Sequence, residues 1–175
     1  MRVVYVIGLP GSGKTTMVNW AVEQVGIPAV PVLDVPVPHV RYGWLWHVGR
    51  PRADFGGTDT LSMSIQPKAI RWLGEIESEC GVLVAEGDRL ANGKFFDVCP
   101  NLTIVHLDTP LDEAHRRATD RAATLGREPQ SDTWWRGRAT KVANLVARYE
   151  VVTLDGKLPP DMLADEFYSL LTHCW

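Results

Sequence analysis

The sequence has 175 residues, and its 18 lysines and arginines against 21 aspartates and glutamates give a formal net charge of −3. A composition with 45% hydrophobic and 22% charged residues excludes wholesale disorder. The acidic balance excludes a uniformly basic nucleic-acid binder but leaves room for a local basic patch. No apolar run approaches the roughly 18–20 residues that a membrane-spanning helix needs. The three cysteines share no metal-ligand spacing, so we expect one domain, residues 1–175, without a membrane segment, in a reducing cytoplasm.

Five short apolar runs are spaced as buried strands, with segments of helical periodicity between them. The expected strands are Val3–Ile7, Ala29–Leu33, Val82–Ala85, Leu102–Leu107 and Val151–Leu154. The expected helices are Lys14–Val25, Gln66–Ser78, Pro110–Ala123, Thr133–Tyr149 and Asp161–Leu171. Strands that are apolar on both faces and alternate with helices are typical of a parallel sheet covered on two sides. The sequence therefore predicts an α/β fold.

The connection between the second and third expected strands, residues 34–66, is unusually long and rich in proline, glycine and aromatic residues. Connections of this length are usually functional or partly helical. Within it, residues 40–52 interleave aromatic and basic side chains, a pattern that suits stacking of bases beside a phosphodiester backbone. Packing of Trp44 and Trp46 in the core explains the same pattern at least as well.

The strongest motif directly follows the first expected strand. Residues 8–15 read Gly-Leu-Pro-Gly-Ser-Gly-Lys-Thr, a complete G-x-x-x-x-G-K-[ST] phosphate-binding loop between a strand and a helix. Its glycines let backbone N–H groups converge on a phosphate, and the helix N-terminus adds partial positive charge. Lys14 can reach the β- and γ-phosphates, and the Thr15 hydroxyl can ligate Mg²⁺. We expect ATP and Mg²⁺ as cofactors, and the expected nucleotide-binding residues of this segment are Gly8, Pro10, Gly11, Ser12, Gly13, Lys14, Thr15 and Thr16.

This loop, the strand spacing and an arginine-rich segment after the fourth strand resemble the P-loop kinases related to nucleoside monophosphate kinases. The resemblance implies a three-layer sandwich with a five-stranded parallel sheet of order 2-3-1-4-5. It also implies an arginine-rich lid, here residues 116–138, and an acceptor-side insertion, here residues 34–66. Residues 55–72 and 135–140 further resemble small phage-encoded kinases, among which are enzymes that phosphorylate 5-hydroxymethyluracil within DNA. A phage-encoded kinase would act in the host cytoplasm.

Acidic residues follow two of the expected strands, where ligands of a parallel sheet collect. Asp34 comes directly after the second strand, and the resemblance implies a base there that takes the proton of a hydroxyl acceptor. A solvated turn is the alternative. Glu86 and Asp88 follow the third strand and share a face in extended geometry. We expect Glu86 to contact the metal or its water and Asp88 to act on the acceptor. The alternative is that these acids only cap the helix that follows.

Basic charge is concentrated in residues 111–148, where eight basic residues against five acids give +3, so that the rest of the chain carries −6. Guanidinium groups stay charged and bind phosphate oxygens bidentately. Arg117 and Arg121 lie four apart on one helical face, and we expect them to bind the transferring phosphates, with Arg138 on the nucleotide as well. A solvated basic helix face is the alternative.

The sequence thus predicts an ATP- and Mg²⁺-dependent kinase that transfers a γ-phosphoryl group to a hydroxyl on a nucleotide-like acceptor, including 5-hydroxymethyluracil in modified DNA. The expected catalytic residues are Lys14, Asp34, Asp88, Arg117 and Arg121, and the expected metal ligands are Thr15 and Glu86. Two alternatives stay open. A nucleoside monophosphate kinase has a phosphate as acceptor and needs no strong base, and a nucleotide hydrolase or switch would act with a protein partner. The oligomeric state does not follow from the sequence.

Overall fold

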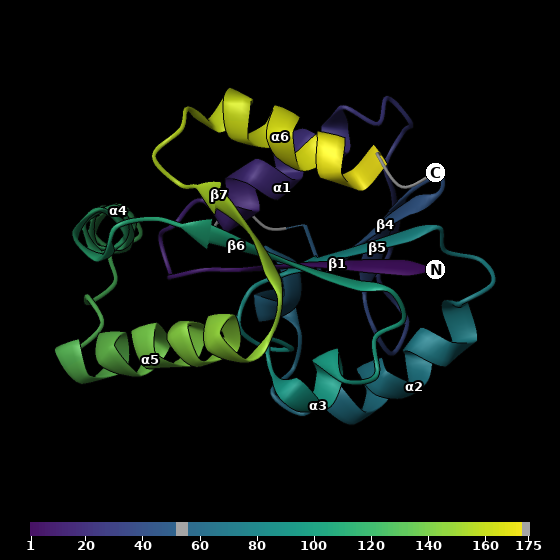
Figure 1. Cartoon of the computed structure of the whole chain (residues 1–175), viewed down its shortest axis with the longest axis horizontal. Helices are drawn as coiled ribbons and strands as arrows, with labels where there is room; N and C mark the ends of the chain where they lie inside the picture. Colours follow the sequence, from purple (N-terminus) through teal and green to yellow (C-terminus); the bar gives the residue numbers. More distant parts are fainter. Residues whose placement is uncertain (52–55, 173–175) are drawn as a thin grey trace.

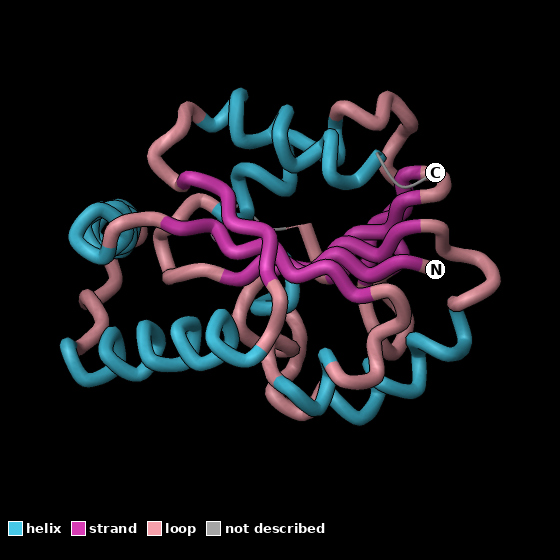
Figure 2. The backbone as a smooth tube through the Cα atoms, viewed as in Figure 1, coloured by secondary structure: helices cyan, strands magenta, loops and turns pink. Residues whose placement is uncertain are grey.

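The computed structural model describes residues 1–51 and 56–172. One sheet with the order β2-β3-β4-β5-β1-β6-β7 runs through this part of the chain, and helices cover both of its faces (Figures 1 and 2). The strands are β1 (Arg2–Ile7), β2 (Val30–Val32), β3 (His39–Tyr42), β4 (Leu45–Val48), β5 (Val82–Glu86), β6 (Leu102–Asp108) and β7 (Val151–Asp155). The helices are α1 (Lys14–Glu23), α2 (Gln66–Ile76), α3 (Gly93–Phe96), α4 (Leu111–Thr124), α5 (Asp132–Arg148) and α6 (Pro160–Thr172), with a short 3₁₀ helix, η1 (Gly57–Thr60).

Five of the strands form a parallel sheet. β4 pairs with β5, β5 with β1, β1 with β6 and β6 with β7, all in parallel. Numbered along the chain, these five strands have the predicted order 2-3-1-4-5. The predicted strand number is wrong, because the sheet of the described residues has seven strands and includes the antiparallel pairs β2–β3 and β3–β4. Every residue of β1 from Val3 to Ile7 is buried, as expected for the central strand of a sheet that is covered on both faces.

The prediction for the second parallel strand is wrong. β2 overlaps the expected segment, but it pairs antiparallel with β3 at the edge of the sheet, and β3 pairs antiparallel with β4. The place beside β5 belongs to β4, which is buried at all four positions, whereas the residues of β2 are exposed or half-buried. The β3–β4 turn has only two residues between paired positions, and its Gly43 has φ +60°, the left-handed backbone that such turns require.

Two apolar clusters hold the helices on the sheet. On one face α1 and α6 pack through residues such as Met17 and Phe167. On the other face α2, α3 and α5 contribute residues that include Trp72, Phe95 and Leu145. Within the described residues, no helix is both long and apolar enough to cross a bilayer.

Part of the aromatic and basic segment 40–52 belongs to the core. Trp46 is buried, its ring stacks on His39 with centroids 4.8 Å apart, and Trp72 lies 6.4 Å away. The Arg41 guanidinium lies 3.8 Å from the centroid of the Trp46 ring. Core packing therefore accounts for Trp46, whereas Arg52, at the end of this segment, lies outside the described residues.

His47 on β4 makes stability depend on pH. Its side chain is buried, Nε2 has no hydrogen-bond partner in the described structure, and burial lowers the pKa of His47 to about 4. An unfolded histidine titrates near 6.5, so below that pH the unfolded chain binds a proton that the folded chain does not. The free energy of unfolding therefore falls as pH drops from 6.5 towards 4.

We expect this residue alone to reduce the free energy of unfolding by about 2 kcal/mol between pH 7 and pH 4.5. Urea unfolding of the wild type and of His47→Phe at both pH values measures the effect. The wild type should lose more stability than the variant over this interval. An equal loss in the two proteins would contradict the assignment.

Candidate active site

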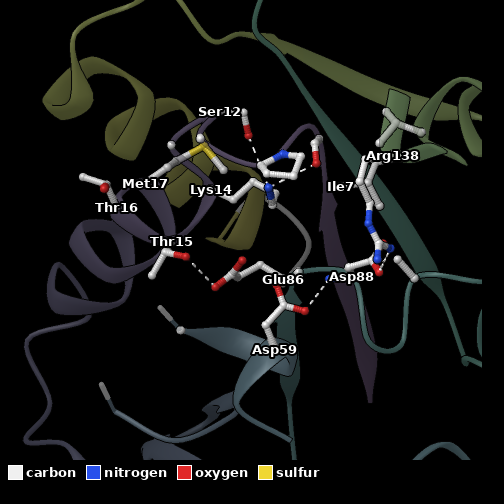
Figure 3. A pocket seen from close by; sticks show the side chains of 18 of the residues that line it. Ile7, Ser12, Lys14, Thr15, Thr16, Met17, Asp59, Glu86, Asp88 and Arg138 are labelled. Atoms are coloured by element: carbon white, nitrogen blue, oxygen red, sulfur yellow. Dashed lines mark hydrogen bonds and ion pairs between the residues drawn. The ribbon is translucent and has the colours of Figure 1, made fainter. Parts of the chain in front are cut away.

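A cavity of about 880 Å³ lies at the carboxyl end of the parallel strands (Figure 3). Its walls come from the segments that follow β1, β4, β5 and β7, together with α4 and α5. This placement follows from the topology, because the carboxyl ends of parallel strands meet at one edge of the sheet.

The loop between β1 and α1 forms the floor of the cavity. Gly11 and Gly13 have φ +77° and +101°, values that other residues rarely adopt. A Cβ on Gly11 would in addition collide with the main-chain oxygen of Ala114 in α4. Gly13 directly precedes α1, so the first amide groups of that helix open onto the loop and make it a site for anions.

Lys14 folds over this loop. Its Nζ donates hydrogen bonds to the main-chain oxygens of Gly8 and Leu9, at 3.1 and 2.8 Å, and to Ser12 Oγ at 3.4 Å. Burial lowers the pKa of Lys14, and the nearby carboxylate of Glu86 works in the opposite direction. The ammonium group is therefore placed beside the helix N-terminus, where both attract the same anionic group.

Thr15 and Glu86 meet between α1 and β5. Thr15 Oγ1 donates a hydrogen bond of 2.8 Å to Glu86 Oε1 (Figure 3). Glu86 is 2% exposed, and burial raises the pKa of its carboxyl group, while the charge of Lys14 and the Thr15 hydrogen bond lower it. Hydroxyl and carboxylate oxygens are ligands that Mg²⁺ prefers, with phosphates and water completing the shell. The donor set thus fits Mg²⁺.

Asp59 in η1 is a cavity residue that the sequence reasoning missed. Its Oδ1 accepts a hydrogen bond of 2.9 Å from the backbone N–H of Asp88 (Figure 3). The hydroxyl of Tyr5 donates to the main-chain oxygen of Gly87 at 3.0 Å and lies 3.2 Å from Thr58 Oγ1. A buried tyrosine of β1 thereby ties the segment after β4 to the turn after β5 and fixes Asp59 beside Asp88.

Asp34, the base expected from the sequence, lies outside the cavity. It is exposed between β2 and β3 and is not among the described residues that line the cavity. The premise for its catalytic role was that it follows the second parallel strand, and β2 is an antiparallel edge strand. The parallel neighbour of β5 is β4, and Asp59 follows β4. Recognition of β4 in the sequence would have directed attention to Asp59.

Asp88 holds α5 against the end of β5. Lys141 Nζ lies 2.7 Å from Asp88 Oδ1 and 3.0 Å from its main-chain oxygen, and Arg138 pairs with Asp88 Oδ2. The Arg138 guanidinium carbon is also 5.1 Å from the centroid of the Trp134 ring, which lines the same cavity. One carboxylate therefore pairs with two cations, of which Lys141 was not among the expected site residues.

The remaining expected residues lie on the cavity wall. Arg117 and Arg121 project from α4, and Arg117 Nε donates to Glu113 Oε1 at 2.7 Å. Thr16 and Pro10 line the cavity too. The structure thus brings together all the expected site residues except Asp34, namely Gly8, Pro10, Gly11, Ser12, Gly13, Lys14, Thr15, Thr16, Glu86, Asp88, Arg117, Arg121 and Arg138.

Comparisons with known proteins agree with this arrangement. The model of a family described as P-loop Nucleotide Kinase3 matches residues 1–164. The fold is similar to that of a sugar kinase from Janibacter sp. HTCC2649, with 19% identity, 98% of this chain and 94% of that chain covered, and a TM-score of 0.56. It is also similar to shikimate kinase from Aquifex aeolicus, with 17% identity, 98% and 96% covered and a TM-score of 0.51. The fold is similar as well to that of deoxyadenosine kinase from M. mycoides, with 10% identity, 99% of this chain and 100% of that chain covered, and a TM-score of 0.51. No curated protein sequence matches the chain.

Proposed function

The chain belongs to the P-loop Nucleotide Kinase3 family, and is thus a phosphotransferase that uses ATP; we propose that it transfers the γ-phosphoryl group to a hydroxyl on a nucleotide-like acceptor. In this reaction the acceptor oxygen forms a bond to the γ-phosphorus, and the bond from that phosphorus to the bridging oxygen breaks. ADP leaves, and the hydroxyl proton passes to a base on the protein.

The contacts of the Asp59 carboxylate support the proposal that the acceptor is a hydroxyl. Within the described residues this carboxylate forms no ion pair, and one of its oxygens accepts only the backbone N–H of Asp88. Asp88, by contrast, is bound by Arg138 and Lys141, so both of its carboxylate oxygens already have donors. We therefore assign the base to Asp59, in place of Asp34, and assign Asp88 the task of holding α5 in position.

Three cationic groups support transfer of the phosphoryl group. Lys14 and the amide groups before α1 surround the phosphates, and Arg117 and Arg121 reach the cavity from α4. Fixed cations stabilise the charge that develops on the transferring group without reorganisation. We propose that residues 116–138, which carry these arginines, act as the lid over the phosphates.

Thr15 and Glu86, whose oxygens lie 2.8 Å apart, would hold Mg²⁺ together with the phosphates. When bound with the phosphates, it neutralises their charge and orients them. The Thr15 hydroxyl can ligate it directly, and Glu86 can accept hydrogen bonds from its water molecules.

The acceptor can be a base that bears a hydroxymethyl group. Trp134 and Arg138 together offer an aromatic ring and a guanidinium in the cavity wall, a combination on which nucleobases stack. We therefore keep 5-hydroxymethyluracil, free or within DNA, among the proposed acceptors.

A panel of acceptors with ATP labelled on the γ-phosphate tests the function. The panel comprises free nucleotides, nucleosides, and DNA with and without hydroxymethylated bases. We expect label on a hydroxyl-bearing nucleotide acceptor. Label on the phosphate of nucleoside monophosphates would instead identify a nucleoside monophosphate kinase, and phosphate release without any acceptor would support a hydrolase or switch.

A further inference from the structure

Within residues 1–51 and 56–172, six cationic side chains line the cavity, and two of them have neither a hydrogen bond nor an ion pair. The lining cations are Lys14, Arg89, Arg117, Arg121, Arg138 and Lys141. Lys14 is bound to loop oxygens, Arg117 to Glu113, and the two cations of α5 to Asp88. Arg89 and Arg121 remain, and the Nε of Arg89 is buried with no acceptor in the described structure.

The strand order places these two arginines in different halves of the cavity. Arg121 belongs to α4, which follows β6, and on the same side Leu158 and Pro160 follow β7. We call this side, over β6 and β7, the nucleotide half. Arg89 follows β5 and lies on the other side of β1, with Asp59, which follows β4. We call this side, over β4 and β5, the acceptor half.

Within the described residues, Arg89 forms no ion pair with either aspartate of the acceptor half. Asp88 is bound by Arg138 and Lys141, and Asp59 accepts the backbone N–H of Asp88 but pairs with no cation. The buried Nε of Arg89 therefore has no oxygen acceptor in this part of the chain. A buried guanidinium nitrogen without an acceptor costs free energy, and an oxyanion that accepts two parallel hydrogen bonds removes this cost.

We propose that Arg89 binds an oxyanion on the acceptor, a phosphate ester or a carboxylate, at a distance from the hydroxyl that is phosphorylated. The inference rests on the proposed function and narrows its acceptor to hydroxyl compounds that carry a negative charge of their own. Asp59 then takes the proton from one end of the acceptor while Arg89 holds the other.

Two matched pairs of probes test the proposal by calorimetry, with the phosphate loop first saturated by a non-hydrolysable ATP analogue. The first pair is 5-hydroxymethyl-2′-deoxyuridine and its 5′-monophosphate, and the second is glucitol and gluconate. In at least one pair we expect the anionic probe to bind the wild type at least about tenfold more tightly. The pair that shows the preference tells whether the oxyanion is a phosphate ester or a carboxylate.

Variants of Arg89 test whether this residue causes the preference for the anionic probe. Arg89→Ala should remove it, and Arg89→Lys should retain part of it, because a lysine keeps the charge but not the planar fork. Arg71→Ala, which removes an exposed arginine of α2 outside both the cavity and residues 116–138, should leave it unchanged. Thermal unfolding verifies that each variant is folded, and Arg89→Lys preserves the test if the alanine variant is not.

The same titrations separate this proposal from the function on which it rests. Wild-type protein without a preference for either anionic probe, including protein that binds none of the four, would overturn the role of Arg89. So would a preference that persists in Arg89→Ala. Failure of the ATP analogue to bind, by contrast, would contradict the proposed kinase activity.

Discussion

Replacing Lys14 with alanine is expected to lower the rate of phosphoryl transfer by about 10³-fold while the protein stays folded. The ammonium group lies over the phosphate loop, held by the main-chain oxygens of Gly8 and Leu9, and it is the cation closest to the start of α1. Its loss removes a fixed charge from the place where negative charge develops during transfer. The remaining amide groups of the loop still bind phosphate, so a residual rate is expected.

Labelled transfer from ATP measures the rate, and thermal unfolding verifies the fold. Lys68→Ala is the matched control, because Lys68 is an exposed lysine of α2 outside the cavity. Its rate should equal that of the wild type. Turnover of Lys14→Ala within tenfold of the wild type would contradict the role assigned to this residue.

Replacing Asp59 with asparagine is expected to lower kcat for a hydroxyl acceptor by about 10²–10⁴-fold. An asparagine keeps an oxygen that can accept the backbone N–H of Asp88, so the local structure should persist while the ability to take a proton is lost. The affinity for ATP should stay within about twofold, because Lys14 and the loop are unchanged.

Asp34→Asn serves as the matched control, since it makes the same chemical change on an exposed residue outside the cavity. Its kcat should equal that of the wild type. A large loss in Asp34→Asn together with full activity in Asp59→Asn would restore the assignment made from the sequence. Full activity in both would show that the acceptor needs no base, as for a phosphate acceptor.

The parts that could be predicted from the sequence are those set by local patterns. The phosphate loop needs a fixed spacing of glycines, lysine and threonine, and the structure places Gly8–Thr15 at the floor of the cavity as that spacing implies. Strands and helices with clear periodicity appear where expected, as β1 and α1 show.

The parts that could not be predicted depend on pairing between distant segments. Ala29–Leu33 is the more apolar run, whereas β4 contains His47 and looks less like a buried strand. Only its pairing with β5 reveals its place. Asp59 likewise follows β4 at a distance and reaches the cavity through the contacts that Tyr5 and Asp88 make around it, which no spacing rule encodes.

The β2–β3 hairpin has a consequence for how the sheet moves. Without it β4, the strand that leads to Asp59, would form the margin of the sheet, where strands open most readily. With it β4 is paired on both sides, and the margin shifts to β2. Pro31 within β2 lacks an N–H group and so discourages other strands from adding there. Amide hydrogens should accordingly exchange fast in β2 and slowly in β4, which keeps fraying two strands away from the site of phosphoryl transfer.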